Sequence, residues 1–151
     1  MITERAQDTL HKIRARTHRN CVVCGTANGR GLRLVFRPSE DGSVQATFDC
    51  EKAYEGYANV LHGGVVSALL DGAMTNCLFA HEHPGVTAEL TVRFRHPVRT
   101  DTTATVRAWI EGCSPPLHVL RAELTQDGQL RATARGKFME RARMATGRRC
   151  F

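Results

Sequence analysis

The sequence has 151 residues and lacks the features that mark several large classes of protein. It contains no internal repeat and no low-complexity tract, so its length corresponds to one globular domain with its own core. No apolar run follows the basic N-terminus, and no stretch of about 20 apolar residues occurs. We therefore expect a cytoplasmic protein with no signal peptide and no membrane partner.

The cysteines also lack the second pair that a zinc site normally has. Cys21 and Cys24 have the spacing of metal ligands, but the sequence has no other C-x-x-C pair and no H-x-x-x-H motif. We therefore predict that the protein uses no metal and no cofactor. Metal binding through Cys21 and Cys24 stays an open alternative.

The middle of the chain has no excess of positive charge. The formal net charge is +6, yet residues 20–140 hold 12 Lys and Arg against 13 Asp and Glu. The excess lies in residues 1–19, with a net charge of +3, and in residues 141–151, with a net charge of +4. We therefore predict a basic N-terminal extension (1–19), a central domain (20–140), a basic C-terminal tail (141–151) and no nucleic-acid partner.

What the sequence does contain is a regular succession of structural patterns. Apolar residues at helical spacing predict a short helix over residues 2–16. Alternating apolar residues predict strands over residues 32–37, 44–48, 86–94, 104–110, 120–124 and 130–138. Asp127-Gly128 separates the last two runs, as is typical of a β-hairpin.

The stretch from His62 to Leu78 is small or apolar at almost every position, which predicts a helix buried on nearly all sides. His62, Gly63 and Gly64 open it, where backbone N–H groups have no partner within a helix. Asp71 lies in its middle among apolar neighbours, where a carboxylate is costly unless it has a partner. Asp71 therefore either has a structural partner or takes part in chemistry.

Together these elements predict an α+β domain. Strands with one apolar face each, and a helix that needs burial all round, fit an antiparallel sheet of about six strands wrapped around one long central helix. A short N-terminal helix precedes them.

The opening His62-Gly63-Gly64, with Leu69-Leu70-Asp71 after it, resembles the hotdog-fold acyl-CoA thioesterases, most of all the phenylacetate-pathway (PaaI-like) group. Two further segments carry the likeness: Cys21-Val22-Val23-Cys24-Gly25 with Gly31-Leu32-Arg33-Leu34, and residues 87–97. The resemblance covers residues 20–140 and implies a hotdog fold, an acyl-CoA substrate and active sites at a dimer interface.

The residues suit thioester hydrolysis. Free N–H groups of Gly63 and Gly64, at the positive end of a helix, are suitable donors to the oxyanion that forms on the carbonyl. Apolar neighbours should raise the pKa of Asp71 and make it a better base than an exposed Asp. The resemblance implies that this acid activates water or attacks the thioester itself, and the sequence leaves both roles open.

Gly63 and Asp71 are eight residues apart, which is about 12 Å along a helix. One carbonyl cannot be bound at Gly63 and attacked through Asp71 of the same helix. We therefore predict a homodimer in which antiparallel helices bring each Asp71 near the partner's Gly63. The resemblance implies the same arrangement and makes a homotetramer common.

The remaining candidate residues follow from the resemblance. His62, Thr75 and Thr87 join the catalytic set, while Asn59 and four basic residues form the substrate-binding set, the latter for the CoA phosphates: Arg93, Arg95, Arg99 and Lys137. Each has a structural alternative: a helix cap for His62, packing for Thr75 and Thr87, and a solvated sheet face for the arginines.

We therefore predict an acyl-CoA thioesterase that acts on a small or medium acyl group, aromatic groups included. Two alternatives stay open. One is a hydratase or dehydratase that acts on acyl thioesters with the same fold. The other is a non-catalytic protein that binds a thioester or another small ligand.

Overall fold

The computed structural model describes residues 2–141, so most of the predicted basic C-terminal tail lies outside the described residues. The helices are α1 (Ile2–Thr17) and α2 (Gly63–Ala80), with a single 3-10 turn at Lys52–Tyr54. The strands are β1 (Arg37–Pro38), β2 (Val44–Asp49), β3 (Gly85–Phe94), β4 (Thr103–Ser114), β5 (Leu117–Gln126) and β6 (Gln129–Glu140). They form one antiparallel sheet in the order β1-β2-β4-β5-β6-β3.

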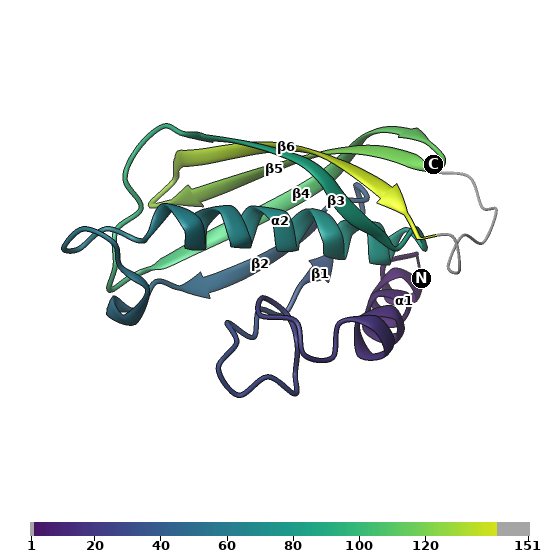
Figure 1. The fold of residues 1–151 in the computed structure, drawn as a ribbon, viewed down its shortest axis with the longest axis horizontal. Helices are drawn as coiled ribbons and strands as arrows, with labels where there is room; N and C mark the ends of the chain where they lie inside the picture. Colours follow the sequence, from purple (N-terminus) through teal and green to yellow (C-terminus); the bar gives the residue numbers. More distant parts are fainter. Residues whose placement is uncertain (1, 142–151) are drawn as a thin grey trace.

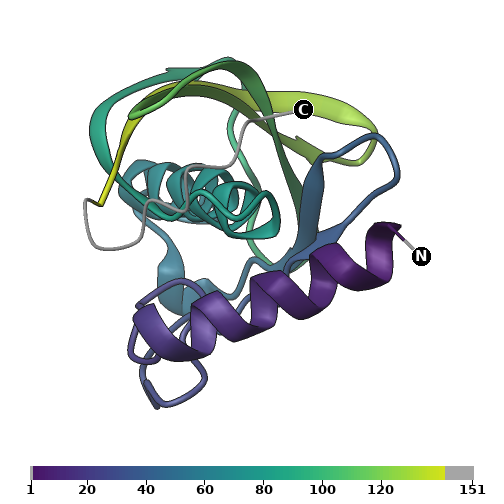
Figure 2. The same cartoon turned by 90° about the vertical axis from the view of Figure 1, so that its right-hand side faces the viewer.

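The sheet curves around α2, as Figures 1 and 2 show. Leu69, Leu70, Ala73, Met74 and Leu78 of α2 are completely buried in the core. By length and composition α2 is the one described helix that could cross a membrane, but 61% of it is buried inside the domain. The helix is therefore the core of the domain, and the predicted hotdog fold is confirmed.

The N-terminal helix lies on the side of α2 that the sheet leaves open (Figure 2). Leu10 and Ile13 of α1 are buried there and join the common core. The loop that follows α1 continues along the same side of α2. The N-terminal extension thus closes the face of α2 that the sheet does not cover.

The prediction of a strand over residues 32–37 is wrong, because only Arg37 and Pro38 pair with β2. Residues 32–36 form no regular secondary structure, and Arg33 has a positive φ of 55°. The backbone of this segment bonds to the preceding loop: Leu32 N–H donates to the Val22 carbonyl and Leu34 N–H to that of Val23. Leu34 and Phe36 are still buried. The alternation of apolar residues therefore indicates that one side of this segment is buried. The segment forms its backbone hydrogen bonds with a loop rather than with a strand.

Strand β3 forms one edge of the sheet and pairs only with β6 among the described strands. Leu90 and Val92 pack against the core, but Val86 and Phe94 are 52% and 59% exposed. The apolar alternation of this strand therefore does not correspond to one buried face. An edge strand with exposed apolar side chains is a surface on which another chain can pair.

The predicted hairpin between β5 and β6 is confirmed. Asp127 and Gly128 both have positive φ angles, 52° and 71°, as the turn of a two-residue hairpin requires. The tight turn places β6 between β5 and β3.

Candidate active site

The start of α2 is organised by His62, which is the N-cap of the helix. Its backbone is extended, and its Nδ1 accepts a hydrogen bond of 2.8 Å from the Gly64 N–H. A Cβ at Gly64 would lie only 3.0 Å from that Nδ1, so a glycine fits this close approach. The prediction that both glycines offer free N–H groups is therefore corrected, because His62 already occupies the N–H of Gly64.

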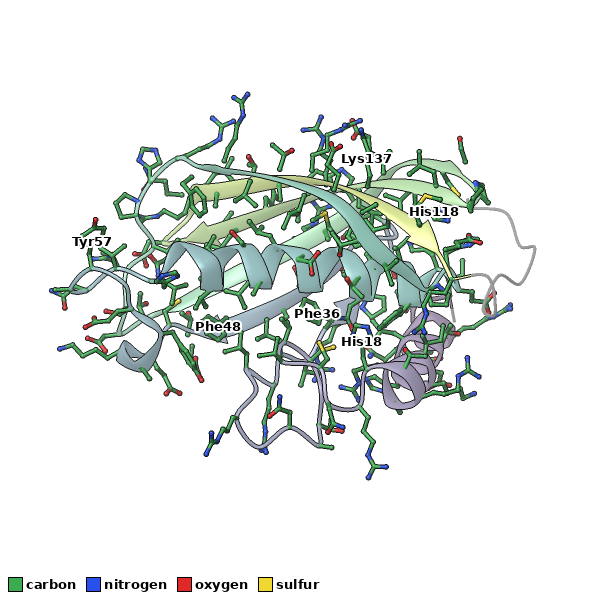
Figure 3. The ribbon with its side chains drawn as sticks, viewed as in Figure 1. His18, Phe36, Phe48, Tyr57, His118 and Lys137 are labelled. Atoms are coloured by element: carbon green, nitrogen blue, oxygen red, sulfur yellow. The ribbon has the colours of Figure 1, made fainter. Side chains whose placement is uncertain are left out.

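Gly63 keeps a free donor. Among the hydrogen bonds of residues 2–141, its N–H has no acceptor. It lies at the wall of a cavity of about 710 Å³ at the N-terminal end of α2, the end where Tyr57 is seen in Figure 3. The cavity is lined by Gly56, Tyr57, Val60, Leu61, His62, Gly63, Val66, Phe94, Arg95, His96, Pro97 and Val98.

Asp71 lies further along α2 and is held by β3. The Thr87 hydroxyl donates a hydrogen bond of 2.7 Å to Asp71 Oδ1. Burial raises the pKa of the Asp71 carboxyl above 3.8, while the bond from Thr87 acts in the opposite direction. A partly buried carboxyl with a raised pKa, beside an exposed strand, has the properties of a general base.

The two parts of the predicted site, the Gly63 N–H and the Asp71 carboxyl, do not meet within one chain. The cavity at the start of α2 includes Gly63, while Asp71 and Thr87 are not among the described residues that line it. The helix alone separates Gly63 from Asp71 by about 12 Å. A single described chain therefore offers an oxyanion donor in one place and a base in another.

Thr75, one turn after Asp71, is 7% exposed and thus buried. Asn59 is exposed with a positive φ of 64°, and its backbone N–H donates to Glu55. Gly56 lies against the His62 ring, where a Cβ would be 3.2 Å from Cδ2. Gly56 and the His62 ring thus lie next to each other in the cavity wall near the helix start.

The predicted phosphate-binding residues fall into two groups. Arg99 pairs with Asp127, and Lys137 Nζ lies 3.3 Å from Glu89. Arg93 and Arg95 are exposed on and just after β3, without an ion-pair partner among the described residues. Of the four, Arg95 lines the cavity.

Two clusters bring together side chains of the types that serve as metal ligands. His83, His118 and Glu140 are joined by hydrogen bonds of 2.8 and 2.6 Å to one Glu140 oxygen. The other cluster adds His18 to Cys21 and Cys24. The metal alternative predicted from the sequence does not include His18, although the spacing H-x-x-C-x-x-C is visible there.

The chain is similar to known proteins of one family. The model of the thioesterase superfamily matches residues 58–133, which include the start of α2 and the pair Asp71–Thr87. A comparison with curated proteins finds no match.

Solved structures agree with this fold. A thioesterase related to phenylacetic acid degradation from Ralstonia eutropha JMP134 is 26% identical, with a TM-score of 0.65 over 72% of this chain and 85% of that chain. The PaaI protein of the E. coli phenylacetic acid degradation operon has a TM-score of 0.76 and 17% identity, over 94% and 97% of the two chains.

A third structure, a hypothetical thioesterase from Streptococcus pneumoniae TIGR4, contains coenzyme A. It has a TM-score of 0.67 and 18% identity, over 72% of this chain and 85% of that chain. Since the family model covers half of the sequence and both halves of the site, the chain belongs to the thioesterase superfamily and is a PaaI-like thioester hydrolase of the hotdog fold.

Proposed function

We propose that the protein hydrolyses a small or medium acyl-CoA thioester, aromatic acyl groups included, at a site shared by two copies of the chain. The observation that carries this proposal is the Asp71–Thr87 pair. It holds a carboxyl of raised pKa on the same helix that presents the free Gly63 N–H to a cavity.

In the proposed reaction the thioester carbonyl oxygen accepts the Gly63 N–H of one chain, and Asp71 of the other chain acts on the carbonyl carbon. As a base, Asp71 takes a proton from water while the water oxygen bonds to the carbon. The carbon–sulfur bond then breaks, and the thiol of CoA leaves with a proton. Direct attack by the carboxylate, with later hydrolysis of the anhydride, is the second route open to the same residues.

The start of α2 suits the charge that develops in this reaction. Negative charge forms on the carbonyl oxygen, and a free N–H at the positive end of a helix stabilises it. His62 restrains the first turn by its bond to Gly64 and so orients the neighbouring Gly63 N–H. We therefore assign His62 a positioning role.

The thiol part of the substrate is proposed from the S. pneumoniae relative, whose structure contains coenzyme A. Arg95 at the cavity wall is the first candidate for the CoA phosphates, with Arg93 beside it on β3. Arg99 and Lys137 already have carboxylate partners, which makes them weaker candidates. A cavity of about 710 Å³ has room for a small or medium acyl group near Gly63.

The dimer follows from the separation of the two halves and from the open edge at β3. Thr87, which holds Asp71, lies on this exposed strand, so a second chain paired there would cover the base. Val86 and Phe94 supply apolar surface along the same edge. A symmetric pair would present each cavity to the Asp71 of the other chain.

The test is thiol release from a panel of short, long and aromatic acyl-CoA esters by the purified protein and its Asp71→Asn variant. Loss of a general base lowers turnover by about 10²–10⁴-fold, while Asn keeps the size of the side chain. Circular dichroism and sedimentation of D71N would check that fold and assembly are intact. Unchanged turnover in D71N would refute the assigned role, and no turnover of any ester by the wild type would favour a binding protein.

A further inference from the structure

We propose that His18, Cys21 and Cys24 bind a zinc ion that fixes the N-terminal extension to α2. Their ligand atoms lie within 4.8 Å of one another, and none of the three belongs to the proposed thioester site. Two thiolates and an imidazole are the donors that Zn²⁺ prefers in proteins.

The backbone around the two cysteines already has the form of a metal-binding turn. The Val23 N–H points to Cys21 Sγ at 3.4 Å, and the Gly25 N–H donates to the Cys21 carbonyl at 2.9 Å. A Cβ at Gly25 would lie 2.4 Å from the Cys21 nitrogen, so this tight turn excludes other residues there. N–H groups aimed at a ligand sulfur stabilise its thiolate, which is the form that binds metal.

His18 completes the cluster from the end of α1. Its Nδ1 lies 4.0 Å from Cys24 Sγ, and its ring packs edge-on against Phe79 of α2, with centroids 4.9 Å apart. In a tetrahedral zinc site the sulfur–nitrogen distance is about 3.6 Å, so closure needs a contraction of only a few tenths of an ångström. Figure 3 shows His18 beneath α2, on the side away from the sheet.

The surroundings allow a metal ion to enter. Cys24 is buried, whereas Cys21 and His18 face a cavity of about 360 Å³ that is open to solvent. Arg16 and Arg19 line this cavity, but two thiolates neutralise Zn²⁺, so the arginines would face an uncharged cluster. Solvent in the cavity would fill the fourth coordination position.

The position of the cluster explains what the metal would do. Val23, between the two cysteines, packs on Gly72 of α2, where a Cβ would come within 2.5 Å of the Val23 side chain. The loop thus touches α2 next to Asp71. A zinc ion bound by His18 and the two cysteines would join the end of α1 to this loop, and would so hold Val23 against Gly72.

The experiment measures the zinc content of the untagged protein, which is expressed in medium supplemented with zinc and then dialysed against a weak chelator. We expect one zinc per chain in the wild type and its loss in Cys21→Ser, Cys24→Ser and His18→Gln. Cys77→Ala, which removes a buried thiol of α2 outside the cluster, is the matched control and should keep its zinc.

Cobalt substitution supplies a second readout. A sulfur-to-cobalt charge-transfer band in the wild type and in C77A, weakened in C21S and C24S, would identify the ligands directly. Because His18 is partly exposed, H18Q tests the site even if a cysteine variant fails to fold. A wild type that retains no zinc after loading, a Cys21–Cys24 disulfide in the purified protein, or equal zinc in H18Q and C77A would each overturn the proposal.

Discussion

At the scale of single residues, the neighbours of Asp71 act on it in opposite directions. Burial within α2 raises its pKa, and the hydroxyl of Thr87 lowers it by stabilising the ionised form. In the proposed reaction the carboxyl must be ionised to accept a proton from water, so the balance between the two effects would set the lowest pH at which the protein hydrolyses a thioester. Under this proposal Thr87 adjusts the pKa of Asp71 as well as holding its side chain in place.

Replacing Thr87 with Ala should move the acidic limb of the kcat/KM profile to higher pH. The variant loses the hydrogen bond that lowers the pKa of Asp71, so the pKa rises further above 3.8 and the proton stays bound to a higher pH. Rates across the pH range with one acyl-CoA ester would measure the shift. Thr103→Ala, at an exposed strand position outside the site, should leave the limb in place. A limb that moves to lower pH would contradict this account.

Gly63 permits a test that removes one N–H and little else. Proline suits the first position of a helix, and the extended backbone of His62, with φ −60° and ψ 135°, is the one that precedes proline. We expect Gly63→Pro to fold and to lose about 10²–10³-fold in kcat, since it lacks the oxyanion donor. Gly63→Ala keeps the N–H, and its Cβ would meet Phe94 at an ordinary 3.5 Å. Equal activity in G63P and G63A would exclude a role for this N–H.

How far the sequence predicts these residues depends on where their partners lie. The raised pKa of Asp71 is predictable because its apolar neighbours lie on the same helix. The sequence offers a helix cap as one of two roles for His62, but which N–H the ring accepts depends on the side-chain rotamer of the cap. That His18 lies beside the two cysteines depends on how the end of α1 meets a loop, although its spacing from Cys21 is visible in the sequence.

At the scale of secondary-structure elements, the central helix and the later strands follow directly from their patterns. Residues 62–78 predict α2 to within two residues, with His62 as its cap. The segment 32–36 has the same alternation as a strand, yet it pairs with the loop at Val22 and Val23. Apolar periodicity reports burial, and the hydrogen-bond partner that decides strand or loop lies elsewhere in the chain.

The edge strand β3 leads to a prediction about assembly. Val86 and Val35 are exposed to similar extents, 52% and 50%, but only Val86 lies on the open edge. If that edge is the dimer interface, Val86→Lys would bury an unpaired charge and weaken association by about 3 kcal/mol or more. Sedimentation velocity over a dilution series should show dissociation of V86K and an intact dimer for Val35→Lys. Equal behaviour of the two variants would place the interface elsewhere.

At the scale of the whole molecule, one chain carries each half of the proposed site once. The cavity with Gly63 lies at one end of α2, and Asp71 lies in the middle of the same helix. The sequence predicts this separation because helical rise is fixed, but the partner's position depends on a surface that no single-chain pattern describes. If two chains share the site, acyl-chain preference is unpredictable for the same reason, because part of the wall that limits the acyl group would belong to the second chain.

A shared site predicts that two inactive variants restore each other. In a mixed dimer of D71N and G63P, one site carries both substitutions and the other carries neither. Random exchange makes half of the dimers mixed, each with one intact site, so activity should return to about a quarter of the wild-type value per chain. The measurement is thiol release after the two proteins are unfolded and refolded together, with each variant refolded alone as the control. Sites built within single chains would give no recovery, since every chain carries one of the two substitutions.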